Sequence, residues 1–485
     1  MEIYFSDYFN VTPKQLNDYG AFNVSLINDL PLFIDPFLLF NSTKPEYKKQ
    51  HERIIQYLAF LRDKSTAHIV SSGLLHAWYR FPEVKQNWFG FSRVGNKGLG
   101  LRDDFGNSLH KNLAAIFPDF GDEKITQGSH LEKLCLIKDG VGKDKISDFT
   151  TNLIKEYLLE YTQNFAIKYI SKNLREKIIV DKVKFNFATE TWERGTFDLP
   201  FYIEDYVLLT PKDILTKDEL WINKDDLYND YSNIPFAIPN NQLRAEIDNY
   251  FRSVLPRRPK AQDYRTAISM VINKYPVILD YYILYKEKDG NRAVSVSSQR
   301  VALAEQQYVQ QIKELSELLR KRSGFYQSEG HTYEDSLTRV NFLKDVIENK
   351  DGYKLFYIKG EPIEREVDLQ ILYRLTWFAT ESDVNREVNN GRGPVDFKIS
   401  KGSKNATIVE FKLASNTQLE RNLQKQVEIY QKASDAQSAI KVIIYFTLPE
   451  FFRVKRILKR LKLENDPNVI LIDARKDNKP SASRA

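Results

Sequence analysis

The stretch from residue 364 to residue 448 most constrains the fold of this 485-residue chain. Four segments within it have the alternation or the continuous apolar run of β-strands: 383–389 (DVNREVN), 395–400 (VDFKIS), 406–414 (ATIVEFKLA) and 439–448 (AIKVIIYFTL). Apolar periodicity predicts a mostly buried helix before them, over 364–379, and an amphipathic helix over 417–433. The predicted order is helix, three strands, helix, strand. The continuous apolar run of the last strand indicates a central place in the sheet.

Two carboxylates and a lysine lie in these strands, where a buried charge is costly. Asp396 follows a Gly-Pro turn, Glu410 comes fourteen residues later, and Lys412 lies two residues beyond. Residues i and i+2 of a strand share a face, so Glu410 and Lys412 point to one side, and Val409 and Phe411 to the other. If the second and third strands pair as a hairpin, Asp396 lies near Glu410. A divalent cation would then relieve the repulsion between the two acids.

The residue types at this position suit phosphate chemistry. Carboxylate oxygens, water and a substrate phosphate are the ligands that Mg²⁺ prefers, and a phosphodiesterase brings these ligands together. A neighbouring lysine can orient or deprotonate the attacking water, or offset the charge that develops on the phosphate in the transition state. The three side chains therefore predict a Mg²⁺ site, in which Mn²⁺ can substitute, with an attendant cation.

This stretch resembles the PD-(D/E)xK nuclease superfamily, the restriction-endonuclease-like fold of type II restriction enzymes and of many repair and defence nucleases. Asp396, Glu410 and Lys412 match the superfamily's motif, and the predicted element order matches its αβββαβ core. Val395 separates Pro394 from Asp396, whereas the motif's proline directly precedes the aspartate. Since that proline is a turn former without a chemical role, the difference does not affect the chemistry. The resemblance covers the C-terminal part of the chain only.

The resemblance implies further site residues on the neighbouring helices. Gln426 and Tyr430 reproduce the Q-x-x-x-Y signature of the RecB-like branch, in which both residues lie beside the metal and contact substrate. The superfamily also places an acid on its first helix. Glu366 is the match here, with Glu364 as a rival and Glu387, on the first strand, as a third candidate. The implied catalytic residues are Asp396, Glu410, Lys412, Gln426 and Tyr430, and the implied metal ligands are Glu366, Asp396 and Glu410.

Each of these features also has a purely structural reading. An exposed strand pair with mixed charges would produce the same spacing of Asp, Glu and Lys. Glu366 would complement the dipole at a helix N-terminus. Tyr430 would be a core residue on the apolar face that it shares with Leu419, Leu423 and Val427. The Gly-Pro turn, the element order and the Gln-Tyr pair together favour the metal site.

The net charge separates the same part of the chain from the rest. The chain carries a net charge of +6, and residues 351–485 hold 24 Lys and Arg against 18 Asp and Glu, so the remainder is balanced. A surplus of this size fits contact with a polyanion. A basic amphipathic helix is predicted over 451–464, and its candidate nucleic-acid contacts are Arg453, Lys455, Arg456 and Lys459.

A second basic tract, RSVLPRRPK, covers residues 252–260. It is a further candidate for contact with phosphates. Both the basic helix and this tract are also compatible with solvated surfaces that bind nothing.

The composition limits the class of protein. Aromatic residues at 13% and charged residues at 28% are typical of a folded globular chain. The single cysteine, Cys135, excludes a disulfide framework within the chain and a cysteine-based zinc cluster. The N-terminus lacks a signal-peptide pattern, and no apolar stretch reaches the roughly 18 residues of a membrane span, so a cytoplasmic protein without a membrane segment is expected. No P-loop motif is present, and none of the six histidines lies beyond His331.

The sequence predicts an α/β (α+β) protein with several regions. Residues 1–297 form a mixed α+β recognition or regulatory region of unknown fold, long enough for two subdomains. Residues 298–350 form a helical connector, 351–476 the nuclease-like domain, and 477–485 a disordered tail. The connector's apolar residues recur at three- and four-residue steps and indicate a helix packed on its own domain rather than a coiled coil: Val301, Ala304, Tyr308, Ile312, Leu315 and Leu319.

A glycine-rich turn before a helix stands out in the first region, at residues 138–154 (KDGVGKDKISDFTTNLI). We expect Ser147 or Asp148 to be the N-cap of that helix. The alternative is that Asp144 and Asp148 belong to a second binding site.

Together these observations predict a Mg²⁺-dependent nuclease, an endodeoxyribonuclease that hydrolyses phosphodiester bonds, with DNA favoured over RNA. The N-terminal region would recognise a substrate, a trigger or a partner protein, or form a homo-oligomer. A single chain with this layout resembles bacterial restriction-like or antiphage defence effectors, by analogy of architecture. The alternatives are a DNA repair or recombination nuclease with the same chemistry, and a catalytically inactive nucleic-acid-binding scaffold protein.

Overall fold

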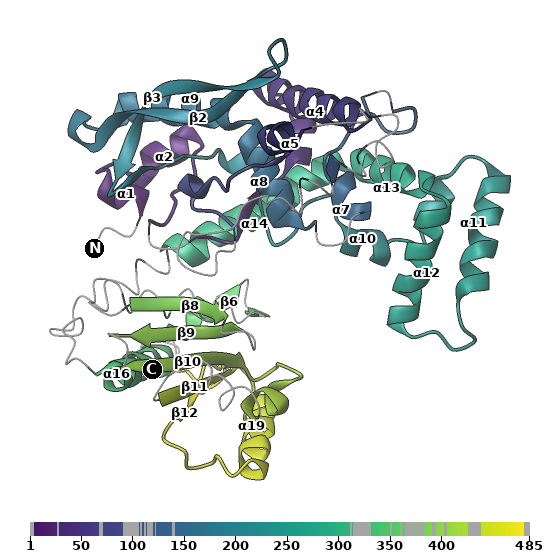
Figure 1. The fold of residues 1–485 in the computed structure, drawn as a ribbon. Coiled ribbons are helices and arrows are strands. Elements are labelled where there is room, and N and C mark those ends of the chain that lie inside the picture. The colour runs from purple at the N-terminus through teal and green to yellow at the C-terminus, as the bar shows by residue number, and fades with distance from the viewer. Residues whose placement is uncertain are drawn as a thin grey trace.

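The computed structural model divides along the chain into an N-terminal lobe, residues 4–310, and a C-terminal lobe, residues 331–479 (Figure 1). For residues 354, 355, 358, 361, 383–389 and 394–396 it describes the backbone alone. The described residues are 4–26, 29–66, 71–90, 106, 109–110, 113, 120–121, 123–137, 141–310, 313, 331–349, 352–358, 361–363, 373, 377, 383–389, 394–401, 405–424 and 438–479.

The N-terminal lobe combines helices with two small sheets. Its helices are α1 (Phe5–Tyr8), α2 (Pro13–Tyr19), α3 (Pro36–Phe40), α4 (Pro45–Ser65), α5 (Ser72–Tyr79), α7 (Lys133–Ile137), α8 (Lys143–Leu153), α9 (Lys155–Tyr169), α10 (Lys224–Asn229), α11 (Asn241–Val254), α12 (Ala261–Lys274), α13 (Val277–Lys288) and α14 (Gly290–Glu305). Its strands are β1 (Leu32–Ile34), β2 (Arg175–Asn186), β3 (Thr191–Tyr202), β4 (Asp205–Tyr206) and β5 (Leu215–Lys217). β2, β3 and β4 form an antiparallel sheet that packs on α9 (Figure 1).

The apolar segment 29–40 becomes strand β1 and helix α3 at the centre of this lobe. Pro36 occupies the first helical position, where its missing N–H costs nothing, and the Asp35 carboxylate accepts a hydrogen bond from the Phe37 N–H at 3.1 Å. β1 pairs antiparallel with β5, so segments almost two hundred residues apart in sequence meet in one core.

Helix α14 ties the start of the predicted connector to the N-terminal lobe. It packs on β5 and spans the predicted boundary between residues 297 and 298. Val301, Ala304 and Tyr308 are buried there, as expected for a helix packed on its own domain. The other three residues of that apolar face lie outside the described residues. On this packing, the N-terminal lobe extends to residue 310.

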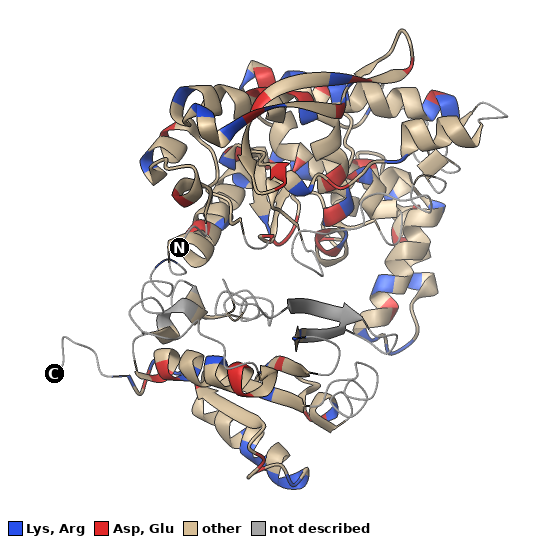
Figure 2. Ribbon diagram, turned by 60° about the vertical axis from the view of Figure 1, so that its left-hand side comes forward, with Lys and Arg blue, Asp and Glu red and all other residues tan. Residues whose placement is uncertain are grey.

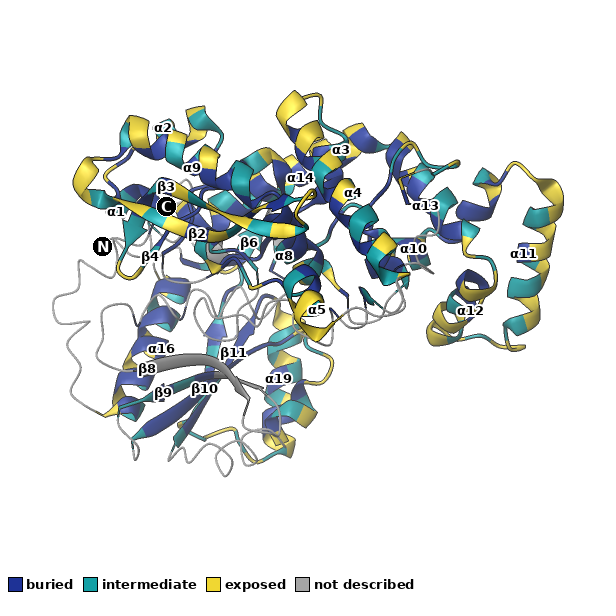
Figure 3. Ribbon diagram, turned by 45° about the horizontal axis from the view of Figure 1, so that its top comes forward, coloured by how far each residue is buried: buried dark blue, intermediate teal, exposed yellow. Residues whose placement is uncertain are grey.

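Helices α11 and α12 form a hairpin that projects from the N-terminal lobe, and we call residues 241–274 the helical arm (Figure 1). Ile247, Ala267 and Ile268 are buried, whereas most of the surface of the arm is exposed (Figure 3).

The C-terminal lobe is built on one mixed sheet. Its elements are α16 (Thr332–Asn349), β6 (Tyr357–Ile358), β7 (Glu361–Pro362), β8 (Asp383–Asn389), β9 (Pro394–Ser400), β10 (Ala406–Leu413), β11 (Ser438–Tyr445), α19 (Leu448–Arg460) and β12 (Val469–Asp473). The strand order in the sheet is β12-β11-β10-β9-β8. β8, β9 and β10 are antiparallel to one another, whereas β10, β11 and β12 run parallel.

Helices cover both faces of this sheet (Figure 3). α16 packs on β9, β10, β11 and β12 from one side. On the other side, the helical residues 419–424 and α19 form a core with the sheet, in which Leu419, Leu423, Val454 and Ile443 are buried together. As a result, every residue of β10 is buried.

The chain is thus a mixed α/β protein, as predicted, and four predicted strands match β8 to β11 closely. β11 is central, because β12 adds an edge strand that the sequence analysis did not predict. Most of the predicted helix 364–379 lies outside the described residues, although Tyr373 and Trp377 are buried. The side chains of Asn478 and Lys479 donate hydrogen bonds to Asp473, so the ordered chain extends beyond the predicted start of the tail at residue 477.

Among the residues that the structure describes, the helices are all too short or too polar to cross a membrane.

Candidate functional site

Strands β9 and β10 pair as the predicted antiparallel hairpin. The register of the two strands is constant up to Phe397, which lies opposite Val409. One step further, the same register brings Asp396 opposite Glu410. Extended by this one residue, the register places the two acids at neighbouring positions on adjacent strands. The side chain of Asp396 lies outside the described residues.

Strand β8 adds a third acid to this row. Arg386 lies opposite Phe397 and Val388 lies opposite Val395, so the position between them brings Glu387 opposite Asp396. Glu387, Asp396 and Glu410 thus follow one another across three strands. We call these three positions the acid row. Like the Asp396 side chain, that of Glu387 lies outside the described residues.

Glu410 and Lys412 are buried side chains on the central strand β10. Their relative exposures are 4% and 8%. Val409 and Phe411 belong to the larger core, whereas Lys412 pairs with Ile443, which packs in the core under α19. Glu410 and Lys412 therefore share the α19 side of the sheet, as strand alternation requires. The Lys412 ammonium donates a hydrogen bond to the Phe411 carbonyl at 3.1 Å.

A second lysine, which the sequence analysis missed, extends the acid row. Lys441 on β11 lies opposite Glu410, and its Nζ donates to the Leu423 carbonyl at 3.5 Å. A single lysine inside the apolar run AIKVIIYFTL was the signal that could have identified it. The acid row is thus followed by a cation on the next strand, and Lys412 supplies another on the same face.

The other residues implied by the resemblance lie outside the described residues. These are Glu364, Glu366, Gln426 and Tyr430. Residues 419–424 of the predicted helix 417–433 are helical, and Leu419 and Leu423 are buried on its apolar face, as predicted. Among the described side chains, no three of His, Cys, Asp or Glu lie close enough together to hold a metal. The side chains of Glu387 and Asp396 are not among those described.

Helix α19 is the predicted basic amphipathic helix. Thr447 and Glu450 cap its N-terminus reciprocally, and Val454, Ile457 and Leu458 are buried. The Lys and Arg side chains of α19 differ in their contacts. Arg453 donates to the carbonyls of Ala414 and Asn416 at 2.7 and 2.8 Å, and so fixes the chain after β10.

The remaining candidate contacts on α19 are more accessible. Arg456 and Lys459 are exposed, and Lys455 is partly buried with its ammonium 6.0 Å from the centre of the Phe451 ring. Arg453 therefore has a structural role that the sequence analysis did not foresee. Arg456 and Lys459 are better placed to meet a ligand.

The predicted N-cap in segment 138–154 is wrong. α8 begins at Lys143 with Gly142 as its N-cap, so Ser147 and Asp148 lie inside the helix. The Ser147 hydroxyl instead accepts a hydrogen bond from the Ile34 N–H at 2.9 Å. Burial, together with the nearby charges of Glu83 and Asp144, raises the pKa of Asp148 to about 8.

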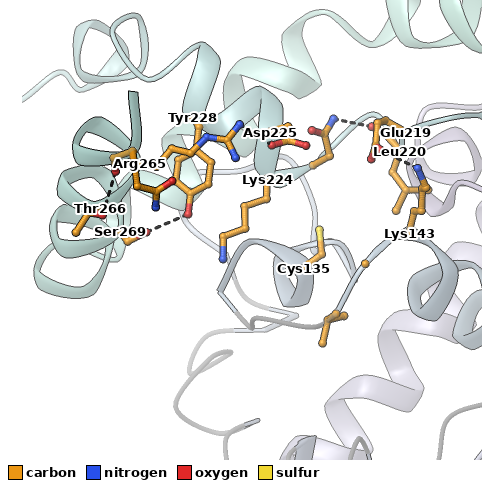
Figure 4. A pocket seen from close by; sticks show the side chains of 14 residues that line it. Cys135, Lys143, Glu219, Leu220, Lys224, Asp225, Tyr228, Arg265, Thr266 and Ser269 are labelled. Atoms are coloured by element: carbon orange, nitrogen blue, oxygen red, sulfur yellow. Dashed lines mark hydrogen bonds and ion pairs between the residues drawn. The ribbon is translucent and has the colours of Figure 1, made fainter. Parts of the chain in front are cut away.

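A cavity of about 550 Å³ lies between α8, α10 and the first half of α12 (Figure 4). Its volume is typical of small-molecule pockets. Its charges are largely paired, since Lys143 bonds to Glu219 at 2.8 Å and Arg265 to Asp225 at 3.2 Å. Burial raises the pKa of the Cys135 thiol well above its usual range, which disfavours the reactive thiolate. The cavity has no recognisable catalytic set.

Two family comparisons match parts of the chain. Residues 10–223 match the family described as Domain of unknown function (DUF8370), and residues 332–448 match Domain of unknown function (DUF8371). The second match starts at the first residue of α16 and contains the whole acid row. No match was found among curated proteins or among solved structures.

Proposed function

We propose that the C-terminal lobe is a metal-dependent nuclease that hydrolyses phosphodiester bonds, with DNA as the favoured substrate. The observation that carries this proposal is the acid row, three carboxylate positions in one line across β8, β9 and β10, next to the buried pair Glu410 and Lys412. The resemblance of the sequence to the PD-(D/E)xK motif and to its element order also supports the proposal.

The donor set fits Mg²⁺ on chemical grounds. Neighbouring carboxylates repel each other, and a divalent cation bound between them relieves that repulsion. Asp396 and Glu410 would hold the ion, with Glu387 or Glu366 as the accessory acid. A bound Mg²⁺ would supply Lewis acidity to the scissile phosphate and lower the pKa of a coordinated water.

The chain's own residues would then act on the substrate. Lys412, on the same strand face as Glu410, would orient the attacking water or offset charge on the phosphate in the transition state. Gln426 and Tyr430 would orient the substrate beside the acids. Lys441, opposite Glu410, would be a second cation near the phosphate.

The proposed role in the cell follows from the layout alone. A nuclease lobe joined to a large N-terminal lobe resembles restriction-like or antiphage effectors, and the same chemistry would serve repair or recombination. We favour a nuclease over a catalytically inactive scaffold, because a scaffold would not need the acid row and its neighbouring lysines.

The test is incubation of the full-length protein with linear and circular DNA and RNA, with Mg²⁺ and with EDTA. We expect cleavage of DNA with Mg²⁺ only, and none by the Glu410→Gln variant purified in parallel. Cleavage that persists in EDTA, or equal cleavage by the variant, would overturn the proposal. A protein that binds DNA and cuts nothing under any condition would favour the scaffold.

A further inference from the structure

The free end of the helical arm carries four cations in nine residues. Arg252 lies in the last turn of α11, Arg257 and Arg258 in the loop, and Lys260 at the N-cap of α12. We call these four residues the arm tip. All four side chains are exposed, and no acidic residue occurs between Asp248 and Asp263. No carboxylate among the described residues forms an ion pair with the tip.

Stability of the arm does not explain this arrangement. Arg252 can complement the dipole at the C-terminal end of α11, but Lys260 lies at the N-terminal end of α12, where a cation is unfavourable. Arg257 and Arg258 are adjacent, so like charges repel across the loop. The tip is therefore better suited to an external anion than to the arm itself.

The tip is also held in shape. Pro256 and Pro259 restrict the loop backbone, and the Asp263 carboxylate accepts a hydrogen bond from the Lys260 N–H at 2.8 Å. The two helices of the arm also contact each other, since the Lys274 ammonium on α12 lies 4.0 Å from the centre of the Tyr250 ring on α11. A preorganised tip loses little conformational entropy on binding.

The position and chemistry of the tip favour nucleic acid over protein. A protein interface normally needs aromatic or apolar anchors, which the exposed residues of the loop lack. A phosphate backbone needs only regularly spaced cations. The loop end of the arm points to the same side of the N-terminal lobe as the C-terminal lobe (Figures 1 and 2). Exposed Arg456 and Lys459 of α19 belong to that lobe.

We propose that the arm tip binds the phosphate backbone of duplex DNA and holds it outside the cleavage site. The choice of DNA rests on the proposed nuclease function, but the contact itself requires neither metal nor cleavage. The arm lies between the two matched families, at residues 241–274, so neither match covers it.

Binding of a fluorescein-labelled 30-base-pair duplex is measured by anisotropy, in EDTA and over a series of KCl concentrations. Three full-length proteins are compared: the wild type, a tip variant with Arg252, Arg257, Arg258 and Lys260 all changed to Gln, and a control variant. The control changes the exposed residues Lys48, Lys49, Lys172 and Lys177 to Gln, and so removes the same charge from other surfaces of the N-terminal lobe.

We expect the tip variant to bind at least about tenfold more weakly than the wild type, with a salt slope smaller by roughly two to four. The control variant should bind within about twofold of the wild type, and both variants should melt normally because their changed side chains are exposed. Equal weakening in the two variants, or none in the tip variant, would overturn the proposal. So would equal tip-dependent binding of poly-glutamate or of phosphatidylserine vesicles.

These measurements separate this proposal from the nuclease proposal. Tip-dependent binding of DNA by a protein that never cleaves would refute the nuclease function alone. A tip variant that cleaves DNA and binds the duplex with unchanged affinity would refute only the proposal that the arm tip binds DNA.

Discussion

Two buried glutamates, Glu287 in the N-terminal lobe and Glu410 in the C-terminal lobe, have different surroundings. In the N-terminal lobe, the buried Glu287 on α13 accepts hydrogen bonds from the N–H groups of Gln127 and Gly128 at 2.8 to 3.1 Å, and one from His130 at 2.9 Å. Its donors all come from one short loop. In the C-terminal lobe, the buried Glu410 belongs to a row of acids across three strands.

We interpret Glu287 as a structural charge and Glu410 as part of the proposed metal site. Glu287 is surrounded by donors that suit a carboxylate, so it holds residues 127–130 against α13 and needs nothing further. Acids at neighbouring register positions repel each other, and in the proposed function a bound cation relieves this repulsion in the acid row. Substitutions should therefore affect folding in one lobe and chemistry in the other.

The largest expected effect is on cleavage. Asp396→Asn, Glu410→Gln and Lys412→Met should each reduce the cleavage rate about a thousandfold or more, because each removes a group that acts on the metal or the phosphate. In EDTA, the melting temperatures of the two acid variants should equal or exceed that of the wild type, since a repelling charge is gone. A near-normal rate in any variant would show that the site is misassigned.

The next effect concerns the boundary of the C-terminal lobe. A fragment that starts at residue 350 lacks α16, whose Val340, Leu343, Val346 and Ile347 are fully buried. Each such side chain contributes about 1.5–3 kcal/mol by burial. We expect the fragment 350–485 to be unfolded by circular dichroism, and the fragment 331–485 to melt cooperatively. Cooperative melting of both would contradict the assignment of α16 to this lobe.

In the N-terminal lobe, Glu287→Ala should lower the free energy of unfolding by about 3–5 kcal/mol, because it leaves buried donors without an acceptor. The exposed pair Lys14–Asp18 is the matched control, and Asp18→Ala should cost less than about 1 kcal/mol. Urea unfolding of the two variants measures both values. Similar losses would remove the contrast between the buried and the exposed acid.

The smallest effect depends on pH. Because the pKa of Asp148 is raised to about 8, the folded protein holds this proton more tightly than the unfolded chain, and stability falls as the pH rises from about 4 to 8. Asp148→Asn should therefore melt a few degrees above the wild type at pH 8.5, with the gain vanishing near pH 4. A gain that is independent of pH would instead indicate better packing.

Much of the C-terminal sheet could be predicted because its strands have strong patterns. Burial of one face of a strand produces alternation, as in 395–400 and 406–414, and burial of both faces produces a continuous apolar run, as after Ala439. Both patterns are visible in the sequence. β12 has only five residues and follows a loop, so its pattern is too short to be distinguished from a short apolar segment of a loop or helix. Glu387 was only a third candidate, because its position opposite Asp396 depends on strand register rather than on any motif.

In the N-terminal lobe, the sequence was less informative for physical reasons. α14 has a polar sequence typical of a linker, yet tertiary packing on β5 makes it part of the core. The start of α8 was misjudged because Gly142 serves as its N-cap, and the residues with better capping side chains lie further along the helix. The basic tract 252–260 was visible in the sequence, but only the fold reveals that it forms the tip of a projecting arm.

The central claim is that the acid row binds a divalent cation, and calorimetric titration with Mn²⁺ tests it without a substrate. The wild type should bind Mn²⁺ at a site that Asp396→Asn and Glu410→Gln abolish or weaken strongly, whereas Glu287→Gln, if folded, should retain it. Lys412→Met should also retain it, because the lysine is a cation and not a ligand. Absence of binding by the wild type, or binding that neither acid variant weakens, would contradict the account.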